Sequence, residues 1–305
     1  MGDRRPIGFF DSGVGGLTVL QEVMRRLPSE SSVYLGDNAR TPYGPRTDDE
    51  VGRFSTECLD ELASRDVKAI IVACNTSTAV ALPALRRRYD VPILGVVRPG
   101  ATAAVLATRS RHVGVIATPA TVRSHAYFEA INEEDPFVEV YEHATPELVP
   151  LVESGGPGRP DAEDVVRRSL QPLLRTMAGH EDAGDATEGL RDDEPSFVFP
   201  IRDDARVDTL LLGCTHYPLL AELVRAVVGP GVAVIDSASA TASALASLME
   251  VHDLGADDPE TVTHHLLTTG DVEAFSATAT RLFGEDLVAA EGITLESARP
   301  AMIGS

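Results

Sequence analysis

Short apolar runs recur along this chain and alternate with segments whose apolar residues repeat with the period of a helix. The runs that we predict as strands are 7–10, 33–35, 69–73, 92–96, 113–116, 138–141, 208–212, 232–235 and 264–267. The segments that we predict as helices are 16–27, 48–64, 76–88, 120–131, 162–177, 218–228 and 238–249. Such alternation is typical of βα units, and it predicts an α/β protein built on mostly parallel sheets.

The chain has 305 residues, which is enough for two domains, and its two halves open in a similar way. The first opens with Ile7-Gly-Phe-Phe-Asp-Ser-Gly and the second with Val113-Gly-Val-Ile-Ala-Thr-Pro. We therefore predict two similar Rossmann-like or flavodoxin-like domains with the active site in the cleft between them. The first domain is predicted as discontinuous, residues 1–97 plus 236–305, and the second as residues 98–235.

One stretch within the second domain, at about 180–206, breaks the pattern. Its first part is rich in acidic residues and glycine and has no apolar period, so we predict a solvated surface insertion. A calcium loop is the alternative, but the regular spacing of oxygen ligands is absent.

Charge and hydropathy exclude several classes of partner. The formal net charge is -21, from 47 acidic and 26 basic residues, which predicts an acidic surface and argues against nucleic-acid binding. No run approaches the roughly 18 apolar residues of a membrane span, and Asp11 interrupts the first apolar stretch too early for a signal peptide. We therefore expect a cytoplasmic protein with no membrane partner and with reduced cysteines.

Two of the three cysteines stand where apolar runs end. Cys74 follows Ala69-Ile-Ile-Val-Ala and precedes Asn75-Thr76, and Cys214 follows Thr209-Leu-Leu-Leu-Gly and precedes Thr215-His216. In an open α/β sheet, ligands bind at the carboxyl ends of strands, so both thiols are predicted to face a ligand, on opposite walls of the cleft. Cysteine is more often a small buried apolar residue, which is our interpretation of Cys58 on the amphipathic segment 48–64.

Polar residues near other strand ends suit a small anionic ligand. Asn75 and Thr76 offer an amide, a hydroxyl and a helix start, although helix capping alone would explain a hydroxyl there. Asp11 and Ser12 precede Gly13-Val-Gly-Gly, which lacks the third glycine of a dinucleotide loop, so we interpret it as a tight turn facing the ligand. His216 could assist the thiol of Cys214 or bind a carboxylate. A Cys-x-His pair is also half of a metal site, but the sequence offers no second ligand pair.

Four motifs together resemble the glutamate racemases of the aspartate/glutamate racemase superfamily, over about residues 7–283. They are Ile7-Gly-Phe-Phe-Asp-Ser-Gly-Val-Gly-Gly-Leu-Thr-Val-Leu20, Gly36-Asp-Asn-Ala-Arg-Thr-Pro-Tyr-Gly44, Ala73-Cys-Asn-Thr76 and Leu212-Gly-Cys-Thr-His-Tyr-Pro-Leu-Leu220. The chain departs from this family at Thr145, where many relatives have cysteine, and in the length of its acidic insertion.

The resemblance implies roles for particular residues. It implies that Cys74 and Cys214 are the two catalytic bases and that Asp11, Glu153 and His216 support proton transfer. It implies substrate binding by Asp11, Ser12, Tyr43, Gly44, Asn75, Thr76, Thr215 and His216, with further contacts from Thr118 and Thr121. The implied reaction is the interconversion of L- and D-glutamate, which would supply D-glutamate for peptidoglycan, and a homodimer is an assembly that the resemblance leaves open.

Inversion of the α-carbon requires removal of a proton on one face and delivery of a proton on the other, which two thiols can do with alternating roles. A modest lowering of a cysteine's pKa would make thiolate available at neutral pH. No pyridoxal-binding lysine motif and no metal site are predicted, so we expect activity without cofactors, with the carbanion stabilised by hydrogen-bond donors.

Three alternatives stay open at this point. One is a racemase for another substrate, such as aspartate or a hydantoin. The second is a non-catalytic amino-acid-binding or regulatory protein of the same fold. The third is a disulfide-based redox role for the thiols.

Overall fold

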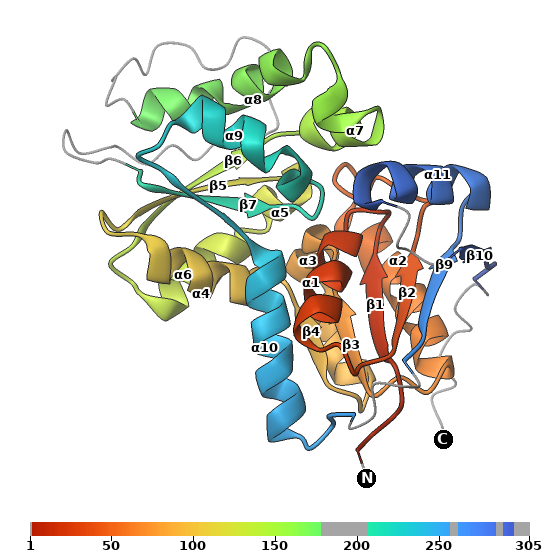
Figure 1. The fold of residues 1–305 in the computed structure, drawn as a ribbon. Helices are drawn as coiled ribbons and strands as arrows, with labels where there is room; N and C mark the ends of the chain where they lie inside the picture. Colours follow the sequence, from red (N-terminus) through yellow and green to blue (C-terminus); the bar gives the residue numbers. More distant parts are fainter. Residues whose placement is uncertain (1, 178–206, 257–261, 285–288, 296–305) are drawn as a thin grey trace.

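A computed structural model describes residues 2–177, 207–256, 262–284 and 289–295 of the chain, and these residues form two parallel sheets (Figure 1). The six-stranded sheet, here called sheet A, has the order β10-β9-β2-β1-β3-β4, and the four-stranded sheet B has the order β6-β5-β7-β8. The strands of sheet A are β1 (Ile7–Asp11), β2 (Ser32–Gly36), β3 (Ala69–Val72), β4 (Ile93–Gly95), β9 (His264–Thr268) and β10 (Ala290–Gly292). Those of sheet B are β5 (His112–Ala117), β6 (Glu139–Ala144), β7 (Thr209–Gly213) and β8 (Ala233–Asp236).

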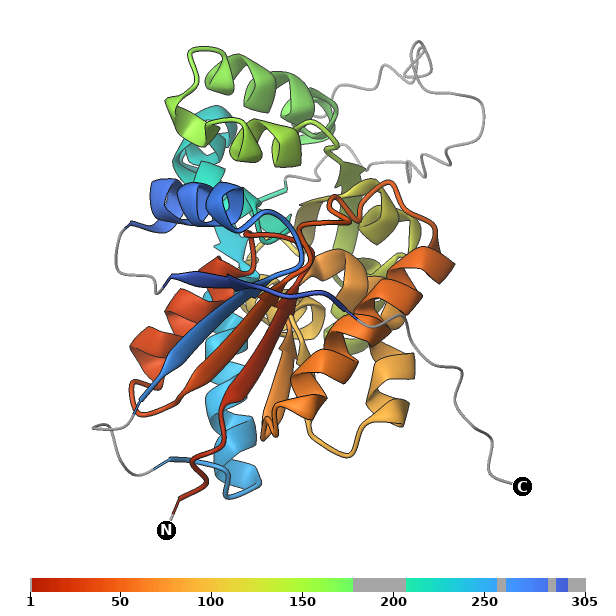
Figure 2. The ribbon, with the colours of Figure 1, turned by 90° about the vertical axis from the view of Figure 1, so that its right-hand side faces the viewer.

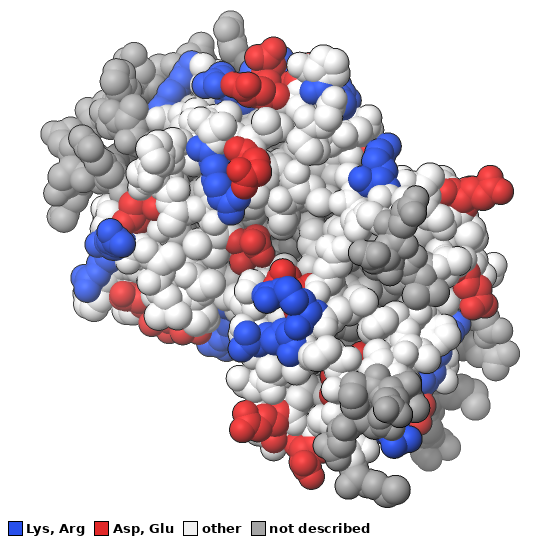
Figure 3. Space-filling view, viewed as in Figure 1, with Lys and Arg blue, Asp and Glu red and all other residues white. Residues whose placement is uncertain are grey.

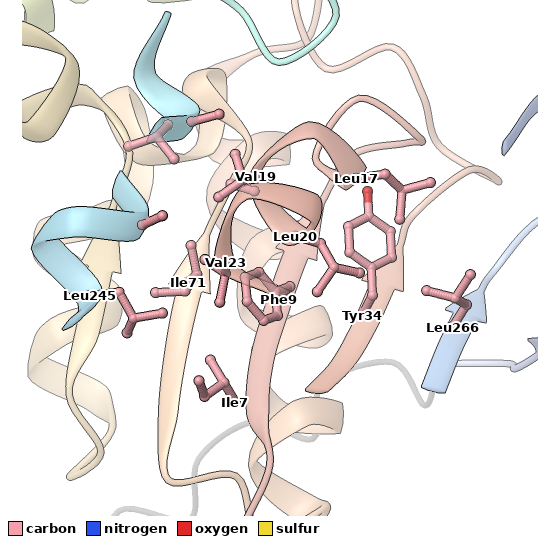
Figure 4. Packing of buried hydrophobic residues seen from close by; sticks show 14 of the residues in the cluster. Ile7, Phe9, Leu17, Val19, Leu20, Val23, Tyr34, Ile71, Leu245 and Leu266 are labelled. Atoms are coloured by element: carbon pink, nitrogen blue, oxygen red, sulfur yellow. The ribbon is translucent and has the colours of Figure 1, made fainter. Parts of the chain in front are cut away.

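Helices cover both faces of sheet A (Figure 2). One face packs against α1 (Leu17–Arg26), α10 (Ser237–Val251) and α11 (Val272–Phe283), in a core that Figure 4 shows for Phe9, Tyr34 and Leu245 among others. The other face packs against α2 (Asp48–Ser64) and α3 (Asn75–Arg88). Because both faces are covered, the central strands are apolar throughout rather than alternating, as is usual for parallel sheets.

Sheet B is covered in the same way on its two faces. On one face lie α7 (Leu148–Glu153), α8 (Ala162–Met177) and α9 (Ala221–Val228), and on the other lie α4 (Val97–Ala107) and α6 (Ala126–Glu134). Three short elements complete the described structure: α5 (Pro119–Arg123) and the 3-10 helices η1 (Gly156–Gly158) and η2 (Tyr217–Leu220). The chain therefore forms two parallel-sheet α/β domains, as the sequence predicted.

Helix α10 leaves sheet B after β8 and packs against α1 beside sheet A and against α4 (Figure 1). Sheet A thus gathers strands from both ends of the chain, and sheet B gathers strands from the middle. The division at about residues 97 and 235 stays a prediction that these sheet memberships support.

Every strand predicted from the sequence overlaps an observed strand, but the helices were predicted less completely. The predicted helix 120–131 is two helices, α5 and α6, because His125 between them has a left-handed backbone with a φ of 53°. The segment 218–228 starts as η2 and continues as α9. The sequence analysis missed α4, α7, α11 and the edge strand β10.

The distribution of charge can be followed on one face of the molecule (Figure 3). On the described residues of this face, acidic and basic side chains are interspersed, so an acidic surface stays a prediction. Residues 178–206, which include the whole of the predicted acidic insertion, lie outside the described residues. Within the described part of the chain, no helix has the length and hydropathy needed to cross a membrane.

Candidate active site

Both strand-end cysteines lie at the carboxyl ends of their sheets, where loops leave the strands. Cys74 follows β3 of sheet A and Cys214 follows β7 of sheet B. The residues around one pocket come from both places: Ser12, Thr41, Pro42, Tyr43, Gly44, Cys74, Asn75, Thr76, Thr118, Val149, Cys214, Thr215 and His216. The two thiols therefore belong to one pocket although 139 residues separate them in the sequence.

Cys74 is the N-cap residue of α3, and its Sγ accepts a 3.4 Å hydrogen bond from the backbone N–H of Ser77. Its thiol also lies 3.6 Å from the hydroxyl oxygen of Ser12. A helix N-terminus favours a thiolate, but burial and the charge of Asp11 outweigh it and raise the pKa of Cys74 to about 11. The expectation of a pKa lowered toward neutrality is therefore wrong for Cys74, which holds its proton at pH 7.

Cys214 has a different neighbour, the imidazole of His216. Sγ of Cys214 lies 3.9 Å from Nδ1 of His216, and Nε2 of His216 lies 3.2 Å from Oε1 of Glu153. Burial alone would lower the pKa of His216, but its hydrogen bonds to Cys214 and Glu153 raise it to about 10. The positive charge of this imidazolium therefore lies next to the sulfur of Cys214.

Asp11 lies behind the pocket, at the end of β1, and its carboxylate is fully buried. Its Oδ2 accepts a 3.0 Å hydrogen bond from the N–H of Gly13, and its Oδ1 accepts one of 3.2 Å from the hydroxyl of Thr215. Burial raises the pKa of Asp11, while the charge of His216 and these hydrogen bonds act in the opposite direction. The carboxylate thus couples the first turn of sheet A to the Thr215-His216 segment of sheet B.

Threonine hydroxyls join the two domains on the other side of the pocket. Oγ1 of Thr76, in α3, lies 2.9 Å from Oγ1 of Thr118, which follows β5, and Thr118 lies 3.1 Å from Thr121. Thr76 and Thr118 line the pocket, whereas Thr121 is fully buried behind them. The predicted extra contacts at Thr118 and Thr121 therefore lie at and directly behind the pocket wall.

Tyr43 and Gly44 line the pocket from the loop after β2, but the phenol of Tyr43 is already bonded. It donates a short hydrogen bond to the buried carboxylate of Asp37, which also accepts from Arg40 at 2.7 Å and from Thr269 at 2.6 Å. Asp37 belongs to the motif 36–44 of the sequence analysis, which assigned it no role. Its position directly after β2 was the signal that could have placed it near the site.

Two further residues named in the sequence analysis, Glu153 and Thr145, lie outside the pocket lining. Glu153 stands behind His216 and is about one-third exposed. Thr145, where many relatives have cysteine, is buried and shares hydrogen bonds of 2.8 and 3.0 Å with the phenol of Tyr217. The pocket between the cysteines has a volume of only about 20 Å³, room for about one water, so its walls must move apart to admit an amino acid.

A larger cavity, of about 490 Å³, opens at the opposite end of sheet A, near Arg4, Arg65 and His265. It contains neither cysteine, so volume does not make it the better site for proton transfer. Among the described residues, no group of three or more His, Cys, Asp and Glu side chains is placed to bind a metal ion.

Comparison with known proteins gives matches over nearly the whole chain. A family model described as Asp/Glu/Hydantoin racemase matches residues 15–181. The glutamate racemase of Shouchella clausii is 43% identical over 275 residues, which is 90% of this chain and 89% of that protein. The crystal structure of glutamate racemase isoform RacE1 from Bacillus anthracis matches with a TM-score of 0.82 at 36% identity, over 96% of this chain and 98% of that one. The structure of glutamate racemase from Francisella tularensis in complex with D-glutamate matches with a TM-score of 0.80 at 29% identity, over 97% and 100%.

The chain therefore belongs to the Asp/Glu/Hydantoin racemase family. Within that family it belongs with the glutamate racemases, and it is an amino-acid racemase, an isomerase.

Proposed function

We propose that the protein interconverts L- and D-glutamate without a cofactor, and that Cys74 and Cys214 exchange protons with the two faces of the α-carbon. The observation that carries the proposal is that thiols from two different sheets line the same pocket. A carbanion is planar at the α-carbon, so a base on one face and an acid on the other can invert the centre.

The surroundings of the two cysteines support unequal resting states. Cys74 is a thiol at neutral pH, because burial and Asp11 raise its pKa, whereas Cys214 lies beside a protonated His216. In one direction the thiolate of Cys214 takes the α-proton and Cys74 delivers its own proton to the other face. In the reverse direction the same two groups exchange roles, which leaves the enzyme ready for the first direction again.

Donors around the pocket would stabilise the negative charge that develops on the substrate's α-carboxylate. Ser12, Asn75, Thr76 and Thr215 supply this set, and all four line the pocket. Of these, the side-chain Nδ2 of Asn75 is buried and has no hydrogen-bond partner, so it can donate a hydrogen bond to a ligand. Asp11, Glu153 and His216 act behind them: Asp11 and Glu153 favour the protonated form of His216, and His216 lies beside the sulfur of Cys214.

Variants of the cysteines test the proposal. Cys74→Ala and Cys214→Ala should each abolish racemisation of both glutamate enantiomers, followed by circular dichroism or chiral chromatography. In heavy water the wild type should place deuterium at the α-position. Cys58→Ala is the matched control, because Cys58 is buried in the core of sheet A. This variant should still racemise glutamate. Full activity in either of the first two variants would refute the two-cysteine mechanism.

The alternatives predict other results. A racemase for aspartate or a hydantoin would turn over that substrate faster than glutamate, whereas the glutamate racemase relatives support glutamate. A binding protein would retain glutamate without exchanging its α-proton. A redox role would require the thiols to cycle through a disulfide, and all three cysteines are free here.

The cellular role is part of the same proposal. We infer a cytoplasmic enzyme that supplies D-glutamate for peptidoglycan, with glutamate as its partner and with no nucleic-acid or membrane partner. A homodimer stays a prediction.

A further inference from the structure

One buried tyrosine outside the predicted site links the segments that carry the two cysteines. Tyr127 lies in α6 of the second domain and is fully buried. Its phenol donates a 2.5 Å hydrogen bond to Oδ1 of Asn75, the first residue of α3, which directly follows Cys74. The bond joins the two domains beside the pocket.

The ring of Tyr127 also packs against the other cysteine segment. A Cβ atom added to Gly213, the residue before Cys214, would lie 2.8 Å from Cε2 of the ring. A Cβ atom added to Gly100 in α4 would lie 3.5 Å from Cε1 and 3.0 Å from Cβ of Ser237. Glycine at 213 therefore allows the ring to reach the backbone that carries Cys214.

The direction of the hydrogen bond decides which way the Asn75 amide faces. Burial raises the pKa of Tyr127, so its hydroxyl keeps its proton, and the hydroxyl of Ser237 at the start of α10 is a hydrogen-bond partner of the phenol. With Ser237 as donor to the phenol oxygen, the proton of Tyr127 points to Asn75 and requires an acceptor there, which is Oδ1. The amide nitrogen then faces away from Tyr127.

That nitrogen is a buried donor in the pocket wall without a partner. Asn75 is 2% exposed and lines the pocket, and Nδ2 has no hydrogen-bond partner. A buried amide N–H without an acceptor is unfavourable, and a ligand oxygen that accepts from it would remove that cost on binding. If the amide turned over, Nδ2 would face the phenol and the carbonyl oxygen would face an anionic ligand.

We propose that Tyr127 is a positioning residue for the racemase reaction: it orients the Asn75 amide so that Nδ2 donates to a carboxylate oxygen of the substrate. The same side chain holds the segment after Cys74 against the segment before Cys214. This inference rests on the proposed function, because it assigns the acceptor of Nδ2 to bound glutamate.

Tyr127→Phe is the direct test, because it keeps the ring and removes the hydroxyl. We expect KM for both glutamate enantiomers to rise about ten- to hundredfold, with a smaller change in kcat, because the charge-assisted bond from Asn75 is no longer preorganised. In a double-mutant cycle, Tyr127→Phe should add little to Asn75→Ala, because both remove the same bond. Tyr89→Phe is the matched control, since its phenol bonds Asp60 and Thr56 far from the pocket, and its KM should equal that of the wild type.

Ser237→Ala gives a second test that leaves Tyr127 in place. Without its partner the phenol can rotate, so KM should rise in the same direction by a smaller factor, and the Asn75 side-chain NH₂ resonances should shift in both variants. An unchanged KM in Tyr127→Phe, or effects of Tyr127→Phe and Asn75→Ala that simply multiply, would overturn the inference. A wild-type protein without glutamate racemisation would instead overturn the proposed function, so the two failures are distinguishable.

Discussion

The hydroxyl of Thr215 donates a 3.2 Å hydrogen bond to Oδ1 of Asp11, which joins the end of β7 in sheet B to the end of β1 in sheet A. Burial raises the pKa of the Asp11 carboxyl group, and this hydrogen bond lowers it. It therefore stabilises the ionised form of Asp11 in a place where water cannot.

Thr215→Val removes this donor with almost no change in shape. We expect the free energy of unfolding to fall by about 1–3 kcal/mol at pH 7, because a buried carboxylate loses a partner. The substitution raises the pKa of Asp11 further, so ionisation of this carboxyl group in the folded state becomes more costly. The loss of stability should therefore shrink as pH falls and Asp11 becomes protonated. Urea unfolding at several pH values measures this. Thr215→Ser, which keeps the hydroxyl, should resemble the wild type, and equal stability of both variants would contradict the assignment.

The His216–Glu153 pair predicts a pH dependence with a definite sign. The pKa of His216 is raised from 6.5 to about 10, so the folded protein binds a proton that the unfolded chain loses at lower pH. This contribution to stability is complete below about pH 6.5 and is lost as pH rises toward 10. Glu153→Gln should lower the pKa of His216 and reduce stability between these values, which an NMR titration of the histidine and urea unfolding can follow.

Glu163→Gln is a control for that experiment. Glu163 forms an exposed ion pair with Arg167 in α8, at 2.8 Å, so its loss should change stability little at any pH. A His216 titration that Glu153→Gln leaves unmoved would mean that the carboxylate does not hold the proton.

Gly15 permits a close approach between the turn after β1 and the segment that follows Cys214. A Cβ atom at position 15 would lie 2.5 Å from both Nδ1 of His216 and Oγ1 of Thr215, so a side chain there displaces both. We expect Gly15→Ala to lower kcat/KM by at least tenfold, because small displacements of catalytic groups are costly. Gly52→Ala in α2 is the matched control: nothing lies within 4 Å, and loss of a helical glycine should stabilise by about 0.5–1 kcal/mol with unchanged activity.

The sequence predicted the strands well because each buried parallel strand is a continuous apolar run. Helices with breaks in that pattern were harder. Pro99 and Gly100 interrupt the helical pattern in the sequence, so α4 was not predicted. Both lie in its first turn, where proline is tolerated, and the helix packs against α6 and α10. Helix α11 begins at an N-cap, Asp271, whose carboxylate accepts from Ala274, and that signal was overlooked.

Most residues that line the pocket belong to the motifs found in the sequence. Contacts between elements that are distant in the sequence could not be predicted from it. Tyr127 was hidden because it lies inside a helix, 52 positions after Asn75, and nothing local to it signals a polar role. The raised pKa of Cys74 likewise depends on its burial and on the charge of Asp11, which the pairing of β1 with β3 brings close to it.

The chain's single lysine is buried at the end of sheet A away from the pocket. Nζ of Lys68 lies 2.5 Å from Oε2 of Glu30 and donates to the carbonyl oxygens of Asp3 and Leu254, at 2.6 and 2.7 Å. Lys68→Met leaves Glu30 as an unpaired buried charge, so we expect a loss of about 3–5 kcal/mol in the free energy of unfolding.

The double variant Lys68→Met/Glu30→Leu separates the cost of the orphaned charge from the worth of the pair. Because the pair itself gains little over apolar packing, the double variant should recover much of the stability that Lys68→Met loses. Urea unfolding of the two single variants and the double variant gives the coupling energy. Strictly additive losses would show that Lys68 does not stabilise the protein through Glu30. It would then act through its bonds to the carbonyl oxygens of Asp3 and Leu254, which connect the N-terminal segment to the segment after α10.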